Sequence, residues 1–178
     1  MPSVLVGRAT THPIDRSVDR TLAMFSGRYF HSIDAKGRVA VPRNFRDALG
    51  GGNESRVIVT LSPDLNSSYL DIYPADKWEP IIQEFMESFD RLDPIEGAEA
   101  REAFLHHYVH SAQEQQLDAQ GRVLVPQEHR NAAGLQKEVV FTGDVKKFRL
   151  WARDEWERAD GRAQANKGKI RAGTTKWL

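Results

Sequence analysis

The stretch "IDAKGRVAVP" at residues 33–42 recurs as "LDAQGRVLVP" at residues 117–126. When residues 34–48 are aligned with residues 118–132, nine of fifteen positions are identical, whereas ordinary residue frequencies predict about one. Two copies of one motif in a single chain predict two similar folding units. The duplication therefore decides which fold we expect.

The similarity continues beyond the motif. "VIVT" at 57–60 corresponds to "VVFT" at 139–142, and "LDIYPADKWE" at 70–79 corresponds to "FRLWARDEWE" at 148–157. Two copies are too few for a solenoid. We therefore expect a pseudo-symmetric pair of small domains, each rich in short strands.

Each motif has the residues of a tight turn between two strands. Aspartate at the first position (Asp34, Asp118) and glycine at the fourth (Gly37, Gly121) favour a type I turn whose glycine has a positive φ. The carboxylate shapes the turn by accepting its N–H groups. Lys36 and Arg38 are left at the tip of the first turn.

Helices are expected around these strands. Pro42 and Pro126 favour the first turn of a short helix, and Arg46 and Arg130 on those helices are expected to be structural. Two helices, Trp78–Leu92 and Pro94 to about Ser111, are expected to connect and brace the halves. The pairs that we expect to cap the helices after each copy are Asp76 with Glu79 and Asp154 with Glu157.

Composition indicates a soluble globular protein. Of the 178 residues 40% are hydrophobic and none is cysteine, so disulfides and thiolate metal sites are excluded. Apolar runs are far shorter than the roughly 20 residues of a membrane-spanning helix. We expect a cytoplasmic protein without a membrane partner.

Charge separates the two copies although the formal net charge is zero. Residues 28–46 hold five basic residues and one acidic residue, a balance of plus four, whereas residues 112–130 have a balance of minus one. Gln120 and Gln127 stand where the first copy has Lys36 and Arg43. We therefore expect the first copy to contribute more phosphate contact if the partner is DNA.

The ordered motifs in both copies resemble the MraZ family of bacterial transcriptional regulators. The resemblance covers roughly Met24 to Arg158 and rests on the D-x-x-G-R turn, the Val-x-Val-Pro exit, the "YP…W" element and the duplication itself. It implies an α+β fold of two swapped-hairpin β-barrel repeats of the AbrB type, packed as an intramolecular pseudo-dimer. It also implies ring-like homo-oligomers on repeated double-stranded DNA sites upstream of division and cell-wall genes, and hence a nucleoid-associated protein.

The expected organisation has five segments. Residues 1–23 form an N-terminal extension expected to be disordered, and residues 158–178 are the end of the last helix and a mobile tail. Between them lie repeat 1 (28–77), a helical linker (78–112) and repeat 2 (113–157). The residues expected at the DNA are Lys36, Gly37, Arg38, Arg43, Gln120, Gly121 and Arg122, with Asp34 and Asp118 shaping the turns.

Other interpretations remain open at this point. Each arginine could simply pair with the aspartate of its own turn. Glu102, His106 and His110 lie four residues apart on an expected helix, which suits a metal-binding enzyme, although we expect no metal, cofactor, small-molecule substrate or catalytic residue. An oligomeric scaffold without DNA binding is the third possibility. No G-x-x-x-x-G-K-[ST] or G-x-G-x-x-G motif is present.

Overall fold

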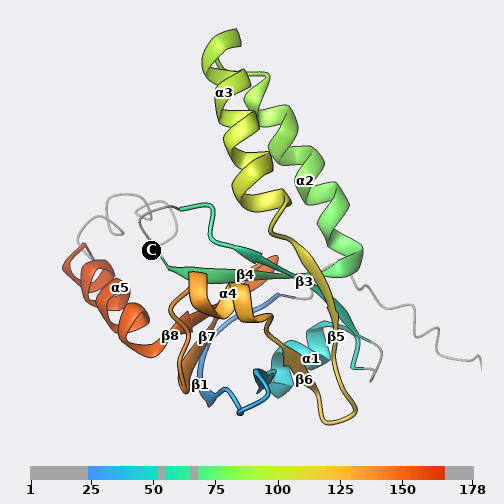
Figure 1. Ribbon diagram of the computed structural model, residues 1–178, viewed down its shortest axis with the longest axis vertical. Coiled ribbons are helices and arrows are strands. Elements are labelled where there is room, and N and C mark those ends of the chain that lie inside the picture. Colours follow the sequence, from blue (N-terminus) through green and yellow to red (C-terminus); the bar gives the residue numbers. More distant parts are fainter. Residues whose placement is uncertain (1–23, 52–54, 65–67, 167–178) are drawn as a thin grey trace, which may run out of the picture.

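The two copies supply the same elements in the same order (Figure 1). The computed structural model describes residues 24–51, 55–64 and 68–166. The first copy forms β1 (Arg28–Ser32), β2 (Arg38–Ala40), α1 (Arg43–Ala48), β3 (Arg56–Leu61) and β4 (Tyr69–Pro74), followed by α2 (Ala75–Phe89). The second forms β5 (Gln113–Gln116), β6 (Arg122–Leu124), α4 (Gln127–Ala132), β7 (Glu138–Asp144) and β8 (Lys147–Ala152), followed by α5 (Arg153–Ala165). The predicted α+β class is confirmed.

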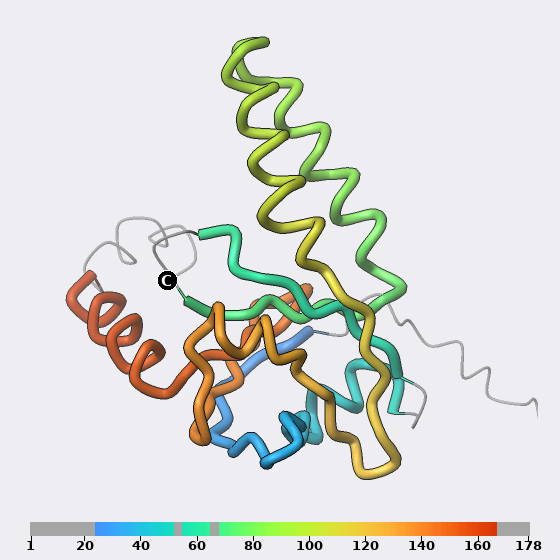
Figure 2. The backbone as a smooth tube through the Cα atoms, viewed as in Figure 1, coloured from blue at the N-terminus to red at the C-terminus, as the bar shows by residue number. Residues whose placement is uncertain are grey.

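The strands pair between the copies. Six of them form one antiparallel sheet in the order β1-β7-β8-β4-β3-β5, and β2 pairs with β6 in a separate two-stranded ribbon. The first strand of each copy therefore lies beside the third strand of the other, β1 against β7 and β5 against β3. Figure 2 lets the reader follow the blue β1 to its orange neighbour β7. The two copies share one sheet.

The larger of two apolar clusters in the described residues lies between the sheet, the ribbon and the short helices, and the smaller one lies at the base of α2 and η2. Alternate residues of the ribbon strands and their exits point inward, so that Val39, Val41, Val123 and Val125 are at most 2% exposed. Phe45 of α1 is fully buried, and its ring packs against Phe141 and Phe148 of the second copy. The core therefore contains side chains from both copies, as the pairing of the strands requires.

The helix starts differ from prediction in detail. Pro42 and Pro126 occupy the residue before the helix rather than its first turn. The expected capping pairs are wrong, because α2 and α5 begin after Pro74 and Ala152 and neither start has a side-chain cap. Asp76 and Asp154 instead lie in the first turns, where a carboxylate is favoured by the helix dipole.

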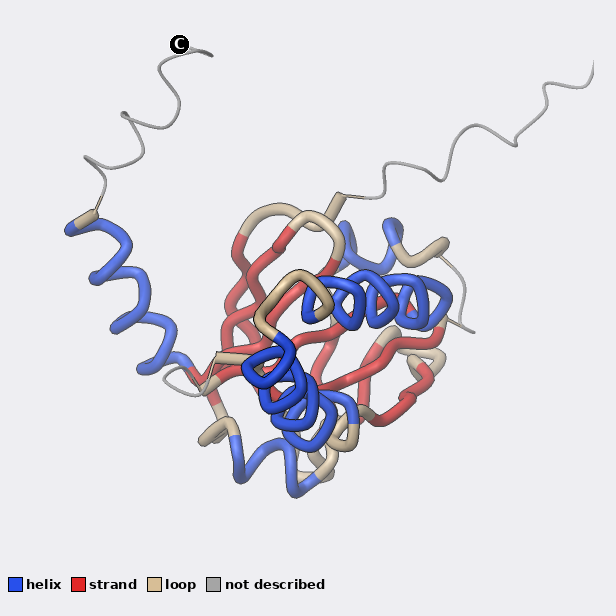
Figure 3. The backbone as a smooth tube through the Cα atoms, turned by 90° about the horizontal axis from the view of Figure 1, so that it is seen from above, coloured by secondary structure: helices blue, strands red, loops and turns tan. Residues whose placement is uncertain are grey.

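The middle of the chain forms a hairpin of helices that projects from the sheet (Figures 1 and 3). It consists of α2, α3 (Pro94–Phe104) and the π-helical turn η2 (Leu105–Val109). Figure 3, which looks from above, shows the helices of this hairpin in front of the strands. The expectation that these helices brace both halves needs correction. At its base the hairpin packs mainly on β3 and β4 of the first copy, it reaches the second copy through the ion pair of Glu84 with Lys146, and it extends away from the rest.

A buried polar network anchors the base of the hairpin. Asp71 of β4 is fully buried and accepts hydrogen bonds from the Tyr108 hydroxyl at 2.8 Å and from Lys147 Nζ at 2.7 Å. The Tyr73 hydroxyl lies 2.8 Å from that of Tyr108. Burial, together with the negative charge of Asp71, raises the pKa of Tyr108, so this hydroxyl keeps its proton and donates. The network joins η2 to β4 and β8.

The last helix lies to one side of the sheet (Figure 1). Trp156 of α5 packs edge-on against Phe30 of β1, with ring centroids 5.4 Å apart. The expected disorder of residues 1–23 and mobility of the terminal tail from residue 167 fall outside the described residues. Among the helices that are described, none is long and apolar enough to cross a membrane.

Candidate nucleic-acid interface

The first motif folds as the predicted turn. The Gly37 N–H donates to the Asp34 carbonyl at 2.9 Å, and Gly37 has a φ of +82°. Asp34 Oδ1 accepts the backbone N–H groups of Lys36 and Arg38, both at 2.9 Å. Asp34 Oδ2 binds the Arg38 guanidinium through Nε at 2.9 Å and Nη2 at 2.7 Å. One carboxylate thus holds both the turn and its arginine.

The second motif repeats this geometry. Asp118 Oδ1 accepts the N–H groups of Gln120 at 3.0 Å and Arg122 at 2.9 Å, and Gly121 has a φ of +71°. Asp118 Oδ2 binds Arg122 through Nε and Nη2, each at 2.8 Å. The two turns are structural as well as sequence repeats.

The β2–β6 ribbon brings the two turns together. Arg38 is opposite Leu124 and Arg122 is opposite Ala40 in an antiparallel register, so the turns lie at opposite ends of a ribbon three residues long. Arg122 Nη1 reaches across to Asp34 Oδ2 at 3.8 Å. The arginines are 30% and 29% exposed. The ribbon therefore presents two partly exposed guanidinium groups on one short element.

Each turn is also covered by an arginine from the other copy. Arg130 of α4 lies over Gly37, where a Cβ would overlap its guanidinium, and Arg130 Nη1 donates to the Val125 carbonyl at 2.5 Å. Reciprocally, Arg46 of α1 lies over Gly121, whose Cβ would come within 2.5 Å of the Arg46 side chain. Arg46 and Arg130, which were expected to pair or to cover the barrel, each cover a turn of the other copy, a crossing that the sequence did not reveal.

Backbone hydrogen bonds reinforce the crossing. The Val41 N–H donates to the Gly121 carbonyl at 3.0 Å, and the Val125 N–H donates to the Gly37 carbonyl at 2.9 Å. Each glycine thus has a positive φ, accepts a bond from the other copy and lies beneath an arginine. The only sequence signal was the repetition of Gly and Arg at matching positions.

The two turns differ at the tip. Lys36 is exposed, and Arg43 is 84% exposed with a loose ion pair to Asp47 at 3.9 Å. In the second turn Gln120 Oε1 accepts a hydrogen bond from Arg122 Nη2 at 3.2 Å. A lysine cannot accept such a bond. The exchange of Lys36 for Gln120 therefore removes a charge and also ties the arginine more firmly to its own turn.

Hydrogen bonds within each turn favour the ionised form of both carboxylates. The side-chain hydrogen bond from Arg38, followed by its backbone N–H, lowers the pKa of Asp34 to about 2. The pKa of Asp118 is also lowered, but there the largest cause is the backbone N–H of Arg122. Both arginines consequently face ionised partners at neutral pH.

The three residues considered for a metal site do not form one in the described part of the chain. His106 and His110 have ring centroids 5.8 Å apart, but no group of three histidine or acidic side chains there could hold a metal ion. The helix is also π-helical over residues 105–109, so the regular α-helical spacing assumed for Glu102, His106 and His110 does not continue through this segment.

The fold and the site define a duplicated α+β protein that presents two arginine-bearing turns on one intramolecular ribbon. The family described as "MraZ protein, putative antitoxin-like" matches residues 24–95 and 109–175. The chain belongs to the MraZ family, and the resemblance found in the sequence is confirmed.

Curated relatives span most of the chain. "Transcriptional regulator MraZ" of Desulforamulus reducens is 36% identical over 143 residues, covering 80% of this chain and 92% of the relative. The proteins of the same name from Lachnoclostridium phytofermentans and Hydrogenovibrio crunogenus are 34% and 35% identical, over 75% and 76% of this chain and 85% and 84% of the relatives. These relatives are named as regulators of transcription, which is not an enzyme class.

The arginine over each glycine can be tested by substitution. We expect Gly37→Ala to cost more stability than Gly134→Ala, because both glycines have positive φ but a Cβ at Gly134 meets nothing within 4 Å. The excess should be about 1–3 kcal/mol, because Arg130 must leave the Val125 carbonyl. Urea unfolding of both variants measures it.

The matched double variant identifies the cause. In an Arg130→Ala background the excess cost of Gly37→Ala should largely disappear, because the overlapping guanidinium is gone. An excess that is unchanged in that background would show that Arg130 is not what constrains Gly37.

The two aspartates should respond differently to loss of their arginines. Arg38→Ala should raise the pKa of Asp34 strongly, whereas Arg122→Ala should raise that of Asp118 less, since its main donor is a backbone N–H that alanine keeps. Carboxyl ¹³C NMR titration measures both. Equal pKa changes in the two variants would contradict this assignment of the main donors.

Stability should depend on pH through Asp34. Because the folded pKa of Asp34 is lowered, its stabilising contribution is complete above about pH 4 and is lost as the pH falls through about 2.

Proposed function

We propose that this protein is an oligomeric, DNA-binding transcriptional regulator whose two arginine turns contact double-stranded DNA. The observation that carries the proposal is the duplicated turn in which an aspartate orients a partly exposed arginine on the β2–β6 ribbon. Membership of the MraZ family supports the regulatory role.

The chemistry of the turns suits a nucleic acid. Arginine offers a planar set of donors to phosphate oxygens or to the O6 and N7 atoms of guanine. The major groove, about 12 Å wide, admits a two-stranded ribbon. Asp34 engages Nε and Nη2 of Arg38, and within the part of the chain that the structure describes Nη1 has no hydrogen-bond partner, so it can donate to an outside acceptor. The Arg–Asp pair is therefore compatible with DNA contact and fixes the direction of the guanidinium beforehand.

The first turn is proposed to dominate the electrostatic contact. Lys36, Arg38 and Arg43 form its DNA-facing set, and Gln120 and Arg122 form the weaker second set. Gly37 and Gly121, which were also expected at the DNA, are buried beneath Arg130 and Arg46 and shape the turns instead. The positive excess of the first copy and the additional hydrogen bond that holds Arg122 both favour this order.

We also propose that the two copies are swapped hairpins of the AbrB type. Two AbrB-type swapped hairpins, repeat 1 at 28–77 and repeat 2 at 113–157, would pack as an intramolecular pseudo-dimer, with residues 78–112 as linker. Pairing of β1 with β7 and of β5 with β3 supports this assignment, because each copy completes the sheet of the other.

Oligomerisation is proposed to provide affinity. A chain of zero formal net charge with two short contact turns should bind a single site weakly. A ring-like homo-oligomer on repeated sites upstream of division and cell-wall genes, as the family resemblance implies, makes later contacts intramolecular. The protein would act in the cytoplasm at the nucleoid, and a scaffold without DNA binding is the rival.

Salt dependence should separate the two turns. We plot the logarithm of the DNA-binding constant against the logarithm of the salt concentration. We expect Arg38→Ala to reduce the magnitude of this slope by about 1 for each phosphate contact that is lost. Arg122→Ala should reduce it less, and Gln120→Lys should steepen it. Fluorescence anisotropy with duplex DNA from upstream of the protein's own gene measures the slopes.

The matched control is Arg158→Ala. Arg158 lies on α5 and pairs with Asp154 and Glu155, far in the chain from either turn, so its loss should leave the slope unchanged. Indistinguishable binding by wild type and Arg38→Ala would remove the support for contact through the turns. Absence of binding by the wild type would favour the scaffold.

The number of binding sites on the DNA tests the oligomeric mechanism. Duplexes that carry several tandem sites should bind about 10² to 10⁴ times more tightly than a duplex with one, since linked contacts raise the effective concentration. Affinity that is independent of the number of sites, or a protein that sediments as a monomer with and without DNA, would contradict the oligomeric mechanism.

A further inference from the structure

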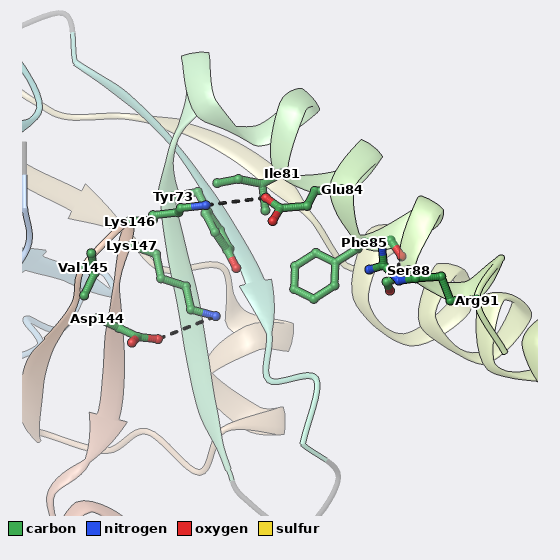
Figure 4. A pocket seen from close by; sticks show the side chains of 10 residues that line it. All are labelled: Tyr73, Ile81, Glu84, Phe85, Ser88, Arg91, Asp144, Val145, Lys146 and Lys147. Atoms are coloured by element: carbon green, nitrogen blue, oxygen red, sulfur yellow. Dashed lines mark hydrogen bonds and ion pairs between the residues drawn. The ribbon is translucent and has the colours of Figure 1, made fainter. Parts of the chain in front are cut away.

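A cavity of about 450 Å³ lies between α2 and the connection from β7 to β8 (Figure 4). Pockets that bind ligands typically measure about 300–1,000 Å³. Its walls include the apolar side chains of Tyr73, Ile81 and Phe85. Figure 4 shows Phe85 and Ile81 on the helix facing Tyr73 and Lys147 on the sheet.

The rim of the cavity carries charges of both signs. Lys146 Nζ lies 3.5 Å from Glu84 Oε2 across the opening, and Asp144 and Arg91 also line it. Lys146 and Glu84 are 69% and 72% exposed, so their ion pair is weak. The rim therefore suits an occupant with balanced charge and apolar anchors, rather than a polyanion.

The chain enters the sheet at this rim. Phe25 and Val145 exchange two backbone hydrogen bonds, N–H of Phe25 to O of Val145 at 3.0 Å and the reverse at 3.1 Å. Val145 lines the cavity, has a φ of +56° and is 58% exposed. The bridge keeps the register in which Arg28 is opposite Thr142. In this register Met24 comes opposite Lys146, whose side chain points to α2 (Figure 4).

Close packing fixes the point of entry. A Cβ at Gly143 would overlap the backbone of Phe25 and Ser26, and Gly143 N–H donates to the Gly27 carbonyl at 2.8 Å. The backbone that leads into β1 is therefore held against the end of β7. Met24, the first described residue, therefore lies beside the cavity.

We propose that the segment immediately before Met24, residues 15–23, occupies this cavity as an intramolecular ligand. Its sequence "DRSVDRTLA" holds two aspartates, two arginines and the apolar residues Val18 and Leu22. Two apolar side chains can enter between Phe85 and Tyr73 while the alternating charges meet Lys146, Glu84 and Asp144. Nine extended residues span up to about 30 Å, so length does not limit the fit.

The occupied cavity would tie the helical hairpin to the second copy. α2 follows the first copy, whereas Asp144, Val145, Lys146 and Lys147 belong to the second. A segment between them would add apolar contacts to both, at the place where the hairpin leaves the sheet. This site is separate from the arginine turns and does not depend on the proposed function.

A single introduced thiol gives a direct test, because the chain has no cysteine. Ser88 lines the cavity, so Ser88→Cys in the full chain should react slowly with a thiol reagent. Adding Leu22→Asp, or deleting residues 1–23, should raise the labelling rate about tenfold, as expected for a tethered segment bound most of the time. The variant Glu87→Cys, on the same helix, should react at the same rate in all backgrounds.

The controls distinguish the occupant. Thr21→Asp adds the same charge beside Leu22 and should leave the thiol of Ser88→Cys protected. A peptide of residues 1–23 added to the shortened chain should slow labelling again. Equal rates in the full chain, Leu22→Asp and the shortened chain would overturn the proposal. The thiol of Ser88→Cys could also stay protected after the deletion, to a degree that varies with protein concentration. That result would overturn the proposal, because a second copy of the protein would then be what covers the cavity.

Discussion

Pairing of strands between the two copies is the constraint on which the rest of this structure depends. The partner of β1 is β7 and the partner of β5 is β3, so neither copy can satisfy its own backbone without the other. The core follows from this exchange, since Phe45 of the first copy packs on Phe141 and Phe148 of the second. The β2–β6 ribbon follows as well, and with it the close approach of the two turns.

The same exchange links the two arginine turns mechanically. The backbone of each glycine accepts a hydrogen bond from the opposite copy and lies beneath an arginine of that copy. The orientation of Arg38 therefore depends on α4 as well as on Asp34, and that of Arg122 depends on α1. Such preorganisation reduces the ordering that a binding partner would otherwise have to impose.

The local geometry of the turns could be predicted from the sequence because it depends on residues at most four positions apart, whereas most other features depend on long-range packing. Asp34, Gly37 and Arg38 specify the turn, its positive φ and the contacts of the carboxylate with the N–H groups of the turn. The crossing of Arg46 and Arg130 could not be predicted in this way, because both arginines reach residues of the other copy. The local capping pattern predicts that the last helix of each copy begins at an aspartate, yet the strands β4 and β8 run directly into α2 and α5. The projecting hairpin could not be distinguished from a bracing one by periodicity, since both need an apolar stripe.

A crystal structure of the protein with duplex DNA from upstream of its own gene would test the central claim most directly. We expect both turns at the DNA, with the guanidinium groups of Arg38 and Arg122 within hydrogen-bond distance of phosphates or base edges. We also expect more phosphate contacts around Lys36 and Arg43 than around Gln120 and Gln127. DNA bound to another face, with both arginines contacting only their own aspartates, would contradict this mechanism.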